Sequence, residues 1–120
     1  IKISFPELVF SPVVHFVDRS DLFMGCSQIP IVKISFLAVD KQALKMNRIA
    51  ITGCLVHELC HLINFSETDE RVIDQMVIER GYAEELFQFL KYHDKRYKKY
   101  NKKDGLTKRE VKRIIKKKNK

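Results

Sequence analysis

The stretch His57–Asp74 reads HELCHLINFSETDERVID and holds two histidines four residues apart, followed by a dense run of acids. Side chains at positions i and i+4 of a helix leave the same face one turn apart. The almost uniformly apolar residues before and between the histidines predict a buried helix, which ends near Ile63 because residues 64–66 interrupt the pattern. Two consecutive helices therefore either build a metal site here or form the polar end of an ordinary helical hairpin.

His57, Glu58 and His61 form the motif HExxH, which is typical of zinc hydrolases. Its spacing lets both imidazoles reach one Zn²⁺ at about 2.0–2.1 Å, while Glu58 can reach a water on that ion without being a ligand. Histidine and glutamate side chains would be costly on a buried helix without a metal or other polar partners. The alternative is a helix with two core histidines and an incidental glutamate.

A catalytic zinc needs a third protein ligand, and the acids after His61 provide candidates. If the two helices are antiparallel and turn near Phe65, His61 and Glu70 each lie about one turn from the connection. His57 and Asp74 then lie level with each other, one turn deeper, because each residue adds about 1.5 Å. We therefore expect Glu70 to be the third ligand and Asp74 to orient His57. The alternative is that both acids belong to a solvated helix face.

Other polar side chains near the motif are weaker candidates. Glu67 falls in the turn, and Asp69 points about 100° away from Glu70 on a helix. Cys60 is expected to be a small buried hydrophobe rather than a ligand. Three residues could stabilise an oxyanion by their type: Tyr82, Tyr92 and His93. Their spacing does not select any one of them.

The two motifs together resemble a known family. Residues 57–61 (HELCH) followed by residues 70–74 (ERVID) look like the HExxH plus ExxxD signature of gluzincins, and the chain is similar to the minigluzincins, small soluble zinc metallopeptidases of archaea. Minigluzincins keep the catalytic core of the HtpX and CAAX prenyl protease type. The resemblance covers roughly Gly25 to Tyr82 and implies metalloendopeptidase activity, with a small mixed sheet over an active-site helix and a glutamate helix. The link from His61 to Glu70 is shorter than in many gluzincins, which implies little room for substrate pockets.

The rest of the chain predicts an α+β fold. Residues 8–20, 25–30 and 31–39 read as strands, and Pro30 limits the second of them to an edge strand or a strand end. Asp40 is a plausible N-cap for a helix from Lys41 to Ile63 with a break near Asn47. Three further helices are predicted: one from a cap at Ser66 to Arg80, one from residue 82 onward, and a short basic one that begins with a capping box at Thr107–Glu110.

Charge divides the chain into two unequal parts. Residues 1–90 carry 8 Lys and Arg against 12 Asp and Glu, a balance of −4, and residues 91–120 carry 15 against 3, a balance of +12. We expect a minimal catalytic domain over residues 1–100 and a basic C-terminal tail over residues 101–120. No apolar run reaches the roughly 18 residues of a membrane helix, and the first residues do not resemble a secretory signal. Three cysteines without close pairing favour a reducing compartment, so the expected protein is soluble and cytoplasmic.

The expected function is zinc-dependent hydrolysis of peptides or unfolded proteins. Zinc would activate a water, and Glu58 would serve as its general base. The tail has the charge to dock on its own acidic body or on a second copy, and latency of this kind is also what the resemblance to minigluzincins implies. Two rivals remain: a zinc-bound domain without catalysis, and a nucleic-acid-binding module that uses the tail, which is less favoured because the tail lacks arginine-rich base-reading patterns.

Overall fold

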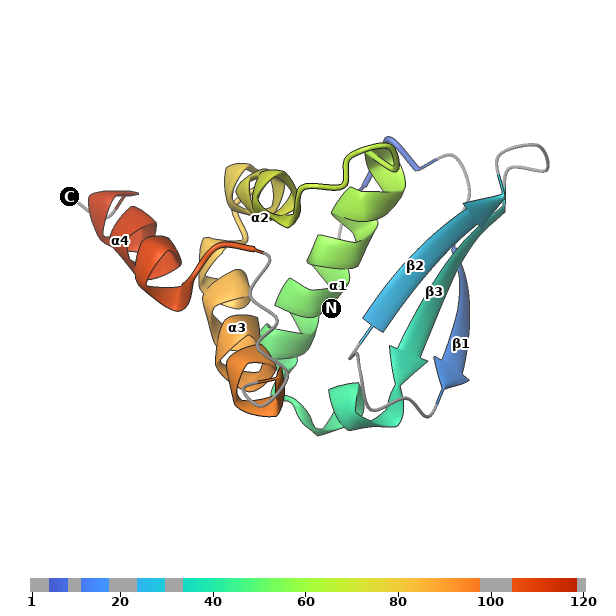
Figure 1. The fold of residues 1–120 in the computed structure, drawn as a ribbon, viewed down its shortest axis with the longest axis horizontal. Helices are drawn as coiled ribbons and strands as arrows, with labels where there is room; N and C mark the ends of the chain where they lie inside the picture. The colour runs from blue at the N-terminus through green and yellow to red at the C-terminus, as the bar shows by residue number, and fades with distance from the viewer. Residues whose placement is uncertain (1–4, 9–11, 18–23, 30–33, 98–104, 119–120) are drawn as a thin grey trace.

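The computed structural model describes residues 5–8, 12–17, 24–29, 34–97 and 105–118. It confirms the α+β class: a small mixed sheet near the N-terminus is followed by four α-helices (Figure 1). The regular elements are β1 (Val13–Val17), β2 (Met24–Ile29), β3 (Ile34–Asp40), the 3₁₀ helix η1 (Lys41–Lys45), α1 (Arg48–Ile63), α2 (Glu70–Glu79), α3 (Ala83–Tyr97) and α4 (Lys108–Lys118).

The sheet has the order β1-β3-β2, so β3 is the central strand. β1 runs parallel to β3, with Val13 opposite Phe36, and β2 runs antiparallel to it, with Met24 opposite Val39. The prediction that the second strand lies at an edge is confirmed within the described part of the sheet. Parts of the predicted strands, residues 9–11, 18–20 and 30–33, lie outside the described residues.

The chain enters the central helix through a break. The Asp40 carboxylate accepts a hydrogen bond from the Gln42 amide at 2.8 Å and starts η1, which ends at Lys45. Asn47 then caps α1, because its side-chain oxygen accepts from the Ala50 amide at 2.9 Å. The predicted helix over residues 41–63 is therefore two helices that meet at the expected break.

Helix α1 lies between the sheet and the other helices (Figure 1). On one side Leu59 and Leu62 pack with Leu37 of β3. On the other side α1 packs closely against α3, where a Cβ on Gly53 would collide with the backbone carbonyl of Glu85. An apolar surface on both sides explains why α1 shows no strong polar face, and it fixes the HExxH motif in a rigid setting.

Helix α2 starts later than predicted. Ser66 does not cap it; residues 64–69 form the connection, and the Asp69 side chain accepts from the Arg71 amide at 2.9 Å to become the N-cap. Aspartate is as good a cap as serine, and its position lets α2 begin directly at Glu70. The helix ends as predicted at Gly81, which has a φ of 92°.

The last helix begins with the predicted capping box. The Thr107 hydroxyl accepts from the Glu110 amide at 3.1 Å, and the Glu110 carboxylate accepts from the Thr107 amide at 3.2 Å. Leu106 and Val111 are 4% and 0% exposed and belong to the same core cluster as α1, α2 and α3. Part of the basic tail is therefore packed against the body. No helix within the described residues is long and apolar enough to cross a membrane.

Candidate metal centre

Two helices supply the polar side chains of the site. His57, Glu58 and His61 project from α1, and Glu70 and Asp74 come from the first turns of α2. Ile73, fully buried on α2, packs in the main core and holds α2 against α1. The level pairing expected from the hairpin is present, since His57 meets Asp74 at 2.8 Å and His61 meets Glu70 at 3.1 Å.

Three of these side chains converge on one point. The Nε2 atoms of His57 and His61 lie 3.2 Å apart, and Glu70 Oε2 lies 2.9 Å from the first and 3.1 Å from the second. Ligands held about 2.0–2.1 Å from a tetrahedral zinc ion lie about 3.3 Å from one another. The three donor atoms are thus almost as far apart as zinc ligands, and this group could hold one metal ion.

Asp74 connects the site to two other parts of the molecule. Its Oδ1 lies 2.8 Å from His57 Nδ1, which fixes that ring with Nε2 turned toward His61 and Glu70. Its Oδ2 accepts a hydrogen bond from the Leu106 backbone amide at 2.9 Å, and a Cβ on Gly105 would collide with the same oxygen. Asp74 is 3% exposed, so these two bonds are what satisfies its buried carboxylate.

The electrostatics follow from this geometry. Burial by itself lowers the pKa of His57, but hydrogen bonds to Asp74 and Glu70 outweigh burial and raise that pKa to about 10. Hydrogen bonds from His57 and His61 hold the pKa of Glu70 well below its usual range. A proton on His57 Nε2 occupies the lone pair that a metal ion would bind. The proton and a metal ion therefore compete for this atom.

Glu58 lies beside this cluster without joining it. Glu58 is 9% exposed, and burial raises its pKa, partly opposed by the neighbouring His57 and His61. The Cys26 thiol of β2 lies near it, and burial together with the charge of Glu58 raises the pKa of that thiol to about 12. Cys26 is therefore a neutral neighbour that ties the edge strand to the glutamate.

The weaker candidates take other roles. Asp69 caps α2, and Glu67 accepts from the Asp69 amide at 3.2 Å, so neither reaches the histidines. Cys60 is fully buried, and burial raises the pKa of its thiol to about 11, which disfavours the thiolate that a metal needs. The aromatic candidates are spread along α3 and its start, with His93 packed on Phe89 at a ring-centroid distance of 5.6 Å.

Four neighbours of the site were not predicted from the sequence. The Leu106 amide and Gly105 reach Asp74 from a point 32 residues further along the chain, and Cys26 reaches Glu58 from the sheet. The Phe89 ring lies 6.5 Å from the His57 ring, centroid to centroid. Gly105, two residues before the capping box, is the one visible signal, but nothing in the sequence connects it to Asp74.

Asp74→Asn is expected to lower zinc affinity by about 10–100-fold, the usual loss when the group that orients a ligand is changed. The asparagine side chain has only one acceptor oxygen. It therefore cannot accept from His57 and from the Leu106 amide with two separate oxygens, as the carboxylate does. Gly105→Ala, which presses on the same carboxylate, should act in the same direction. Calorimetric titration of the metal-free proteins measures both, and affinities equal to that of the wild type would show that Asp74 does not hold His57 in place.

Comparison with protein-family models, curated proteins and solved structures gives no match for this chain. The interpretation of the site therefore depends on the residues of this chain alone. Two imidazole nitrogens and one carboxylate oxygen face one another, a second carboxylate orients the first ring, and a buried glutamate lies beside them.

Proposed function

We propose that this protein is a zinc-dependent metalloendopeptidase of the minigluzincin type. The observation that carries the proposal is the convergence of His57, His61 and Glu70 with Glu58 held separately beside them. A structural metal site needs a closed shell of ligands, whereas three ligands with a neighbouring glutamate leave a position open for a reaction. Two imidazoles and a carboxylate are also the ligand set of several catalytic zinc sites.

A zinc ion bound by these residues would polarise the scissile carbonyl and make an attacking water more acidic. The Glu58 carboxylate is the residue placed to take the proton from that water and to pass it to the leaving amine. Its raised pKa brings the carboxylate closer to the working pH, where proton transfer in both directions is efficient. Asp74 keeps His57 in the tautomer that presents Nε2 to the site.

The edge strand β2 supports binding of an extended substrate. It lies on the outside of the described sheet, it packs against α1, and its Cys26 contacts Glu58. A peptide that adds to this edge would run beside the glutamate and make backbone hydrogen bonds that require no particular side chains. The substrate class is therefore extended or unfolded polypeptide.

Latency through the tail is a further part of the proposal. The packing of α4 keeps residues 105–118 close to the site, and the bond from Leu106 to Asp74 makes this segment part of the support for His57. A chain that ends near Asn101 would lose this support together with any inhibition. Raising the salt concentration weakens the charge contacts of the tail but leaves the Leu106 segment in place. It therefore tests inhibition by the tail without removing the support for His57, which truncation cannot do.

The proposal is tested with unfolded casein and zinc-loaded protein. We expect cleavage of internal peptide bonds, identified by mass spectrometry of the products. We also expect cleavage to stop when the zinc is removed with a chelator and to return when zinc is added. Intact casein after long incubation at high enzyme concentration and at both low and high ionic strength, with zinc bound, would instead favour a zinc-bound domain without catalysis.

A further inference from the structure

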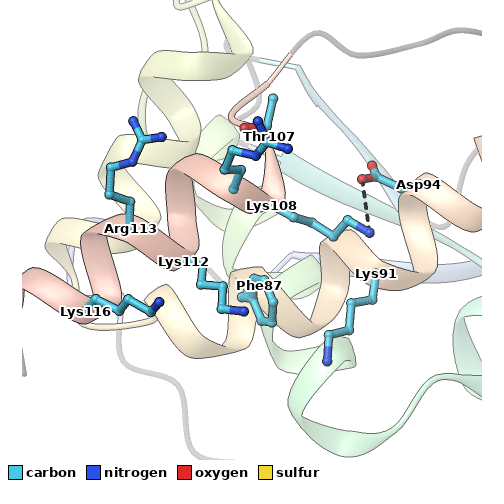
Figure 2. A pocket seen from close by; sticks show the side chains of 9 residues that line it. Phe87, Lys91, Asp94, Thr107, Lys108, Lys112, Arg113 and Lys116 are labelled. Atoms are coloured by element: carbon cyan, nitrogen blue, oxygen red, sulfur yellow. Dashed lines mark ion pairs between the residues drawn. The ribbon is translucent and has the colours of Figure 1, made fainter.

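The side of the molecule away from the sheet carries a groove between α3 and α4. Its volume is about 750 Å³, and Figure 2 shows basic side chains from both helices around it. Among the described residues it is lined by one carboxylate, Asp94, and by six cationic side chains: Lys91, Lys108, Arg109, Lys112, Arg113 and Lys116. One cation is already paired, since Lys108 Nζ lies 3.8 Å from Asp94 Oδ2. Five lining cations remain beyond that pair, and of these the Arg113 side chain extends from α4 away from Phe87 (Figure 2).

These cations stand on a fixed support. α4 packs its inner side into the core through Val111, which is fully buried, and through the partly buried Ile114 and Ile115. At its start, Glu110 and Arg71 of α2 form a two-point ion pair at 2.6 and 3.0 Å. The basic face of α4 is therefore ordered beside α3, unlike a loose tail whose charges would spread through the solvent.

The spacing of the charges is regular. Lys108, Lys112 and Lys116 follow one another at four-residue steps, which place them about 6 Å apart along the helix. Arg109 and Arg113 form a second row with the same step, and guanidinium groups bind phosphate oxygens in pairs. Such rows suit a polymer that carries one anionic group on every unit.

The floor of the groove adds an aromatic ring. Phe87 of α3 lies between the basic side chains in Figure 2, with Lys91 Nζ 4.9 Å from its ring centroid. Cationic grooves with an aromatic residue are typical of proteins that bind single-stranded nucleic acid.

We propose that the groove between α3 and α4 binds the phosphate backbone of a single-stranded nucleic acid. The net charge of −4 on residues 1–90 repels such a strand from the rest of the body, so binding is confined to this face. The sequence alone disfavoured binding of nucleic acid. The packing of α4 beside α3 supports it, because cations of the basic tail line one groove. It is independent of the proposed peptidase activity.

Fluorescence anisotropy of a labelled 12-nucleotide oligo(dT) with the full chain tests the proposal. For five phosphate contacts, the slope of log affinity against log salt should be about −3.5, so affinity falls about 100-fold between 50 and 200 mM salt. Lys112→Glu/Lys116→Glu should weaken binding at least about tenfold and make the slope shallower by about 1.4. Thermal melting of each variant confirms that it is folded.

The matched control is Lys41→Glu/Lys45→Glu, which reverses two exposed lysines four residues apart on η1, and it should change affinity less than about threefold. Equal losses for both pairs would overturn the proposal, because binding would then depend on net charge alone. So would the absence of binding at 50 mM salt. A 12-residue polyglutamate that displaces the oligonucleotide at equal concentration would also overturn it and assign the groove to acidic polypeptides.

Discussion

Alanine in place of His57, His61 or Glu70 is expected to lower zinc affinity by more than about 100-fold, beyond the 10–100-fold loss typical of residues that only support a ligand. Each of the three contributes one atom to a triangle with sides of 2.9, 3.1 and 3.2 Å, so no two of them can reproduce the site. Removing Glu70 also leaves the two imidazoles facing each other without the carboxylate that attracts a cation. Competition with a chromophoric chelator measures these affinities.

Two substitutions serve as matched controls for the ligand variants. His15→Ala removes a histidine on β1, and Glu67→Ala removes a glutamate in the connection before α2. Neither residue belongs to the group of three, so both variants should bind zinc like the wild type. If a control loses as much affinity as a ligand variant, or if a ligand variant retains wild-type affinity, the assignment of the three ligands is wrong.

Glu58→Gln is expected to lower the rate of peptide cleavage by about 10²–10⁴-fold, the usual contribution of a general base, with one zinc ion still bound. The amide has the shape of the carboxylate, so the packing around α1 should be preserved. It cannot accept the proton of the attacking water. Cleavage of a fluorogenic peptide by wild type and variant, each with its zinc content measured, gives the comparison.

The outcome separates catalysis from metal binding. A Glu58→Gln variant that binds zinc and melts like the wild type but cleaves slowly identifies Glu58 as the base. A variant that cleaves as fast as the wild type would show that Glu58 has no part in the reaction, even if the three ligands are correct.

The site could be predicted largely because it depends on local geometry. The helical spacing fixes His57 and His61 on one face, and a short connection leaves few ways to place Glu70 and Asp74 opposite them. The error at the start of α2 did not disturb this pairing. Ser66 and Asp69 are both good caps, and the choice between them depends on how residues 64–69 turn rather than on cap preference.

What the sequence could not supply are contacts between distant segments. The Leu106 amide reaches Asp74 only because Val111 and its neighbours bury α4 against the core, which a very basic segment does not suggest. The groove arises in the same way, from the packing of α3 beside α4. Charge composition indicated a basic tail, and tertiary packing decided where its cations face.

The central claim is that one zinc ion, held by His57, His61 and Glu70, supports peptide hydrolysis. The most direct measurement is the initial rate of casein cleavage as zinc is added stepwise to the metal-free protein. The account predicts a rate that rises linearly until one zinc is bound per chain and then stays constant. A rate that is zero at every ratio at both low and high ionic strength, or one that does not depend on zinc, would contradict it.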